Sequence, residues 1–160
     1  MRRPFVTTMF ALALALPAAN LYAQDPAAAQ QPAAAAAPKV SFTSDAGILL
    51  VQIKPDQTAV FEEMVAKLKA GLAKTEDATL KQQAAGFKVF KAAEPFGANA
   101  LYVVMVEPTV PGAEYELFAM LQKVMTPDEL RAPDMAETWK RFAAAFAAGL
   151  SKLSLTKIGG

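Results

Sequence analysis

The chain has 160 residues, with 16 Lys and Arg against 15 Asp and Glu, and it contains neither histidine nor cysteine. These absences exclude thiol nucleophiles, thiolate metal sites, and an imidazole acting as general base, haem ligand or zinc ligand. A net charge of +1 offers no strongly basic face of the kind that nucleic-acid binding requires. We therefore expect no metal, no cofactor and no nucleic-acid partner.

Residues 1–23 have the pattern of a signal peptide. Arg2 and Arg3 precede an apolar run from Phe5 to Leu16 that is too short to span a bilayer as a mature helix. Ala23 offers a small residue at the cleavage position. The pattern predicts an exported protein, periplasmic or secreted, with no stable membrane insertion. Ordinary secretion is the favoured route, and the Arg2-Arg3 pair leaves twin-arginine export open.

Residues 24–39 are predicted to be a disordered tether, because the stretch QDPAAAQQPAAAAAP has no apolar face to bury. Residues 40–160 are then one domain, long enough for a single hydrophobic core.

The first half of this domain begins with a strand over residues 47–53, rich in branched residues. A helix follows Lys54-Pro55-Asp56, because apolar residues recur at helical spacing. On its polar side Glu63 and Lys67 are placed for an ion pair. A shorter helical piece is expected over residues 75–85. The helical stripe consists of Phe61, Met64, Val65, Leu68 and Leu72.

The second half predicts a hairpin of strands 87–92 and 100–107 around the turn residues 95–99. Helices are expected over residues 113–125 and 134–150, and a last strand over residues 153–158. Thr126 and Glu129 fit a capping box that starts another short helix between them.

This order, β-α-β-β-α-β, is that of an α+β, ferredoxin-like fold. The expected sheet has four antiparallel strands in the order 4-1-3-2, with the helices on one face. Lysines in the second strand and beside the fourth agree with edge positions, where they discourage further pairing. These lysines are Lys88, Lys91, Lys152 and Lys157.

The third strand, within NALYVVMVEP, is apolar on both sides, so its facing is ambiguous. We place Tyr102, Val104 and Val106 on the open face, because tyrosine tolerates a half-wet surface; the alternative set is Leu101, Val103 and Met105. Leu49, Val51, Ile53, Leu153 and Leu155 are assigned to the helix side, and Ser154 and Thr156 to the open face with Lys88. An open face this apolar predicts a sheet-to-sheet homodimer. Its candidate residues are Ile48, Leu50, Gln52, Phe90, Val104 and Val106.

The strand opening GILLVQIKPDQ and the hairpin GFKVFKAAEPFGANALYVVMVEP resemble the dimeric α/β-barrel superfamily, and in particular its antibiotic-biosynthesis-monooxygenase-like members. The resemblance covers roughly residues 46–158 and rests on topology and pattern. It implies a dimer through the sheets and a cavity between sheet and helices. Some members oxidise aromatic substrates without a cofactor; others degrade haem with a histidine ligand, which this chain lacks. The chain also resembles uncharacterised small exported bacterial proteins.

Four aromatic residues could line such a cavity for an aromatic or lipid-like ligand, and Asn99, at the start of the third strand, could orient it. Ordinary core packing and a turn position are the alternative interpretations of these residues. No catalytic residue is assigned: the acidic pair Glu62-Glu63 is expected to point to different sides of its helix, without the convergent burial that acid–base chemistry needs. The aromatic candidates are Tyr102, Tyr115, Phe118 and Trp139.

Three functions remain open from the sequence. The favoured one is an exported homodimer without catalytic activity that binds or buries small apolar ligands. The alternatives are a cofactor-independent, monooxygenase-like enzyme acting on an aromatic substrate, and a structural or interaction protein of the cell envelope. A cavity lined by Tyr102, Trp139 and a buried ionisable group would favour the enzyme, and a cavity lined only by Leu, Phe and Met would favour binding. The absence of any cavity would favour the structural role.

Overall fold

Four antiparallel strands form one sheet in the order β2-β3-β1-β4 in the computed structural model, which describes residues 39–159. This order is the predicted 4-1-3-2 read from the other end, and it confirms the ferredoxin-like fold. The strands are β1 (Ala46–Ile53), β2 (Phe87–Lys91), β3 (Ala100–Val106) and β4 (Ser151–Leu155).

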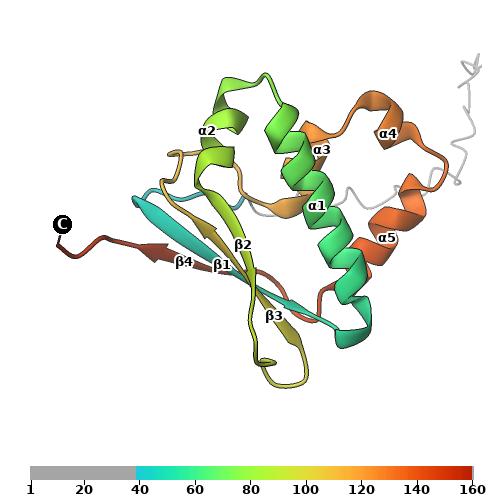
Figure 1. Cartoon of the computed structure of the whole chain (residues 1–160), viewed down its shortest axis with the longest axis horizontal. Coiled ribbons are helices and arrows are strands. Elements are labelled where there is room, and N and C mark those ends of the chain that lie inside the picture. The colour runs from blue at the N-terminus through green and yellow to red at the C-terminus, as the bar shows by residue number, and fades with distance from the viewer. Residues whose placement is uncertain (1–38, 160) are drawn as a thin grey trace, which may run out of the picture. The chain divides into compact units, whose positions relative to one another are not determined.

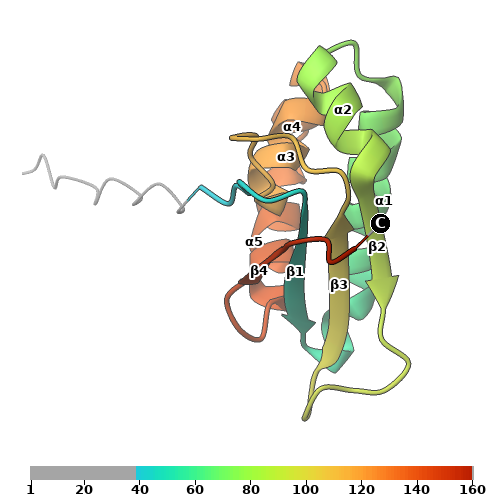
Figure 2. The same cartoon turned by 90° about the vertical axis from the view of Figure 1, so that its left-hand side faces the viewer.

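The helices lie against one face of this sheet (Figures 1 and 2). The first strand shows the two faces clearly, because its side chains alternate between buried and half-buried along its whole length. None of the helices that the structure describes is long and apolar enough to cross a membrane. The helices are α1 (Thr58–Lys74), α2 (Ala78–Gly86), α3 (Leu117–Val124), α4 (Pro127–Arg131) and α5 (Met135–Ala145).

Local chemistry sets the start of α4 and pairs charged residues along α1. The predicted capping box of α4 is confirmed: the Thr126 hydroxyl accepts from the Glu129 amide, and the Glu129 carboxylate accepts from the Thr126 amide. The predicted ion pair between Glu63 and Lys67 on α1 is also present, at 3.2 Å. A 3-10 turn, η1 (Pro55–Gln57), occupies the place where the helix was expected to begin.

Two helices are shorter than predicted because backbone pairing with other segments displaces their ends. Helix α3 begins at Leu117 and not at residue 113, since the Tyr115 amide donates to the Val40 carbonyl in an extended segment. Helix α5 stops at Ala145, since Phe146 forms a β-bridge with Ile53 at the end of β1. The last strand likewise runs over Ser151–Leu155 and not over residues 153–158.

The facing of β3 is the reverse of the preferred prediction. Tyr102, Val104 and Val106 are buried beneath the helices, with exposed fractions of 3%, 0% and 0%. Register is the reason: Val104 is paired with Leu49 and Tyr102 with Val51, and directly opposed residues share a face. Val104 and Val106 therefore do not belong to the open face, which carries Leu101, Val103 and Met105 instead.

The facing of β4 is also reversed. Leu153 is paired with Ile48 and Leu155 with Ala46, so both leucines lie on the open face. Ser154 is paired with Gly47 and lies on the helix side. There Phe42, from the segment before β1, packs so closely on Gly47 that a Cβ would lie 2.2 Å from its ring. The prediction placed the leucines of β4 on the helix side because they are apolar. At this end of the sheet the segment that contains Phe42, and not a helix, covers the inner face.

The open face remains strongly apolar. Ile48, Leu50 and Gln52 lie on it as expected, together with Phe90, which is 50% exposed. Leu153, at 48% exposed, extends the apolar surface across β4. No helix of the part of the chain that the structure describes covers this face (Figure 2).

Candidate functional site

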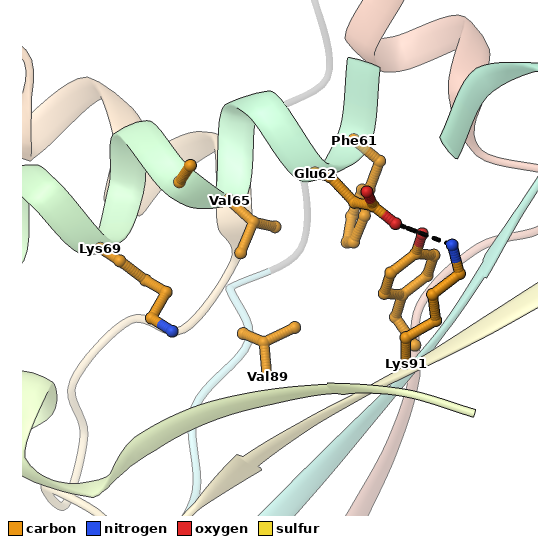
Figure 3. A pocket seen from close by; sticks show the side chains of 8 residues that line it. Phe61, Glu62, Val65, Lys69, Val89 and Lys91 are labelled. Carbon is orange, nitrogen blue, oxygen red and sulfur yellow. Dashed lines mark hydrogen bonds and ion pairs between the residues drawn. The ribbon is translucent and has the colours of Figure 1, made fainter. Parts of the chain in front are cut away.

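A pocket of about 280 Å³ lies on the helix side of the sheet, between α1 and the edge formed by β2 and β3. Figure 3 shows the helix and strand β2 forming its two sides. Half of its lining is apolar and half is ionisable or phenolic, so it is more polar than the predominantly apolar lining of most small-molecule sites. The lining residues are Phe61, Glu62, Val65, Ala66, Lys69, Val89, Lys91 and Tyr102.

The apolar part is built by α1 and the middle of β2. Val65 projects from the helix toward Val89 on the strand (Figure 3). Next to Glu62 along α1, the fully buried Phe61 ring lies 4.6 Å from the Tyr102 ring, measured between centroids (Figure 3). This wall can bury a small aliphatic or aromatic body.

The polar part is a hydrogen-bonded cluster at one end of the pocket. The Tyr102 hydroxyl donates to Glu62 Oε1 at 2.5 Å, and the Lys91 ammonium donates to the same oxygen at 2.9 Å. The Lys91 Nζ atom also lies 5.6 Å from the Tyr102 ring centroid. Figure 3 shows Glu62 reaching from α1 toward Lys91, while Lys69 lies farther along the helix.

These contacts move each pKa away from neutrality. Burial, together with the hydrogen bond to Glu62, raises the pKa of Tyr102 to about 12. The hydrogen bonds from Tyr102 and Lys91 lower the pKa of Glu62, and the Glu62 contact raises the pKa of Lys91. At neutral pH the cluster is therefore a carboxylate held by a phenol and an ammonium.

The predicted cavity residues are only partly brought together. Tyr102 lines the pocket, but Phe118 and Trp139 stack on each other 5.7 Å apart, in an aromatic cluster with Phe142 and Phe146. Phe61 connects this cluster to the pocket through its contact with Phe142. Phe118 and Trp139 therefore pack in the core, which was the alternative to lining a cavity.

Tyr115 and Asn99 lie elsewhere. Tyr115 is fully buried against Phe42, and its hydroxyl accepts from the Val110 amide at 2.8 Å. Asn99 ends the hairpin turn, in a bridge with Phe96. Its amide donates to the side chain of Gln52. Neither residue lines the pocket.

Sequence reasoning missed Glu62, Lys69, Lys91 and Val89. Glu62 and Glu63 point to different sides of α1, as predicted, and Glu63 pairs with Lys67. The partner of Glu62, Lys91, is 29 residues away on β2. The sequence predicts the hairpin that carries Lys91 and Tyr102, and the structure pairs these two residues directly. A helix packed over that hairpin places a carboxylate within reach of both.

A second hollow, of about 470 Å³, lies beside the start of α2 and is lined mainly by polar groups. Two of them have structural roles: Asp77 caps α2 by accepting from the Leu80 amide, and the Gln83 amide donates to the Glu114 carbonyl. Among the described residues there is no group of three or more acidic, histidine or cysteine side chains that could hold a metal. The pocket over β2 and β3 is therefore the better candidate site.

Comparison with known proteins gives one similarity, at the level of structure. No family model and no curated protein matches the sequence. The crystal structure of a protein from Caulobacter crescentus CB15, described as a "putative antibiotic biosynthesis monooxygenase", is similar over 74% of this chain and 94% of that one. The two sequences are 11% identical, and the structures superpose with a TM-score of 0.39.

Proposed function

We propose that this chain is an exported, homodimeric binding protein that holds a small, largely apolar ligand in the pocket between α1, β2 and β3. The observation that carries the proposal is the composition of the pocket wall. Phe61, Val65 and Val89 offer apolar contact, and Glu62, Lys91 and Tyr102 offer a fixed polar end. Such a division orients a ligand that has an apolar body and one polar group.

The ionisation of the cluster favours binding over proton-transfer catalysis. A general acid or base works best with a pKa near the working pH. Here the pKa of Tyr102 is raised and that of Glu62 is lowered, so both groups hold one protonation state throughout the neutral range. Such groups act as fixed hydrogen-bonding and charged anchors.

One observation favours the alternative, a cofactor-independent monooxygenase-like enzyme acting on an aromatic substrate. The Tyr102 ring lines the pocket and packs against the fully buried Phe61 ring, so an aromatic substrate would contact an aromatic wall. A structural role in the envelope is the third candidate, and it needs no ligand.

The homodimer is the second part of the proposal. Leu50 and Val103 are paired across the middle of the open face, and Phe90 and Leu153 extend it toward both edges. Burial of a patch of this kind against a second copy removes the apolar surface from water. The pocket lies on the opposite, helix-covered side, so the proposed dimer leaves it accessible.

Native mass spectrometry of protein purified from the periplasm tests ligand binding. We expect a reproducible extra mass on the wild-type protein and its loss in Ala66→Trp, because that indole would fill the pocket. The matched control is Ala59→Trp, an exposed position near the start of the same helix, which should keep the mass. A protein without bound mass, or a mass that survives Ala66→Trp, would contradict the proposal.

A further inference from the structure

Two hydrogen-bond donors in the pocket converge on one point. The Tyr102 hydroxyl on β3 and the Lys91 ammonium on β2 come from directly paired residues of neighbouring strands. Both donate to the same atom, Glu62 Oε1, at 2.5 and 2.9 Å. A phenol and an ammonium aimed at one oxygen form a binding site for an oxyanion, and in this structure the oxyanion belongs to the chain itself.

The Glu62 carboxylate is held less firmly than the Tyr102 hydroxyl, whereas the Lys91 side chain, at 52% exposed, is as open to solvent as Glu62. The Glu62 side chain is 50% exposed and reaches the cluster from α1, whereas Tyr102 is 3% exposed and fixed within the sheet. Rotation of Glu62 toward solvent would leave the hydroxyl and the ammonium facing the pocket. Because the ion pair with Lys91 is half in water, solvent compensates for much of its loss.

The remaining charge of the pocket favours an anion. Lys69 lines the same pocket on α1, and no ion pair with it is present among the described residues. Once Glu62 has turned away, the lining carries two lysines and no carboxylate. The apolar surface of Val65 and Val89 begins beside the cluster and extends toward Lys69 (Figure 3).

We propose that the ligand is an anionic amphiphile whose carboxylate replaces that of Glu62 on Tyr102 and Lys91, so that Glu62 acts as an internal competitor that closes the empty site. This inference rests on the proposed ligand pocket and deepens it. The ligand's apolar body lies between Val65 and Val89. An uncharged amphiphile can accept both hydrogen bonds but brings no charge to pair with the Lys91 ammonium, and a cationic amphiphile is repelled by it.

The ionisation of the cluster agrees with this assignment. The lowered pKa of Glu62 keeps it anionic at neutral pH, so the group that now fills the site has the charge of the proposed ligand. Tyr102 keeps its proton at neutral pH and remains a donor.

Isothermal titration calorimetry with octanoate, octan-1-ol and octylamine tests the inference on the purified protein. We compare the wild type with Glu62→Gln, which keeps the size of the side chain and removes its charge. The matched control is Glu63→Gln: Glu63 is next to it on α1 and points outward to Lys67. Glu62→Gln/Lys91→Gln removes the ammonium as well, and Ala66→Trp locates the binding in the pocket.

We expect octanoate to bind Glu62→Gln about tenfold more tightly than the wild type, because an internal competitor that occupies the site about nine-tenths of the time weakens apparent affinity by that factor. Glu63→Gln should match the wild type, and Glu62→Gln/Lys91→Gln should lose the gain. The affinity for octanol should change little in Glu62→Gln, Glu63→Gln and Glu62→Gln/Lys91→Gln. Of these three variants, Glu62→Gln should bind octylamine most weakly.

Two results would overturn the inference in distinguishable ways. If octanol binds in the pocket but the affinity for octanoate does not rise in Glu62→Gln, Glu62 does not compete with the ligand. The inference is then wrong, and the proposed pocket stands. If no octyl compound binds any variant, or Ala66→Trp binds them as well as the wild type does, the proposed pocket is wrong and the inference is lost with it.

Discussion

Tyr102 illustrates how a single residue acquires its properties from its neighbours. Its ring is buried against Phe61 on the helix side of the sheet, while its hydroxyl reaches the carboxylate of Glu62. Removal from water disfavours the phenolate, and the adjacent carboxylate disfavours it further. The pKa of Tyr102 therefore rises from 10.0 to about 12.

At the residue scale we predict a phenolate titration step near pH 12 that disappears in Tyr102→Phe. Because the folded pKa exceeds that of an exposed tyrosine, this group stabilises the fold fully below pH 10, and the contribution is lost as the pH rises toward 12. In Glu62→Gln the step should move toward 10.0 without reaching it, since burial is the larger cause. Absorbance titration, with circular dichroism to check the fold at each pH, measures this. An unchanged step in Glu62→Gln would contradict the assigned hydrogen bond.

Helix α1 is the element on which the pocket depends, and its position is set partly by a glycine. Gly71 lies against α3 so closely that a Cβ there would be 2.6 Å from both Cβ and Cγ2 of Val124. In the sequence this glycine only weakens the last turn of a helix. In the fold it permits two helices to approach each other.

At the element scale we predict that Gly71→Ala destabilises the protein, although alanine is the better helix former. The gain in helix propensity is about 1 kcal/mol, whereas overpacking of a filled contact costs about 1–3 kcal/mol. Thermal or urea denaturation should show a net loss of about 1 kcal/mol in the free energy of unfolding.

The matched control for this prediction is Gly149→Ala. A Cβ at Gly149 would meet no atom within 4 Å, so the stability should change by less than about 0.5 kcal/mol. A Gly71→Ala variant that is more stable than the wild type would contradict this prediction. It would show that α3 can shift away from the new methyl group without a large loss of stability.

At the scale of the whole molecule, the sheet has one face beneath the helices and one apolar face without a helix over it (Figure 2). Leu50 and Val103 are half-buried at the centre of that second face. Soluble proteins seldom leave such a surface in water unless it binds something. The proposed homodimer would cover it without blocking the pocket.

We predict that the wild-type protein sediments as a dimer, and that Leu50→Asp and Val103→Asp each yield folded monomers, because a charge would be buried in the interface. Val104→Asp should unfold the protein instead, since Val104 is completely buried beneath the helices. Gln82→Asp, at an exposed position on α2, is the control and should remain dimeric. Analytical ultracentrifugation with circular dichroism separates these outcomes. A wild-type monomer, or charged variants that stay dimeric, would contradict the proposed interface.

The sequence by itself determined the order of the elements, the topology and the capping box of α4. These follow from local patterns: the helical stripe of α1, the turn at residues 95–99, and the reciprocal Thr126–Glu129 contacts. Only the tertiary structure decided the facing of β3, because a strand that is apolar on both sides has no pattern to orient it, and register with β1 placed Tyr102 beneath the helices. The candidate site needed the tertiary structure for the same reason, since Glu62 and Lys91 meet only after α1 has packed across β2.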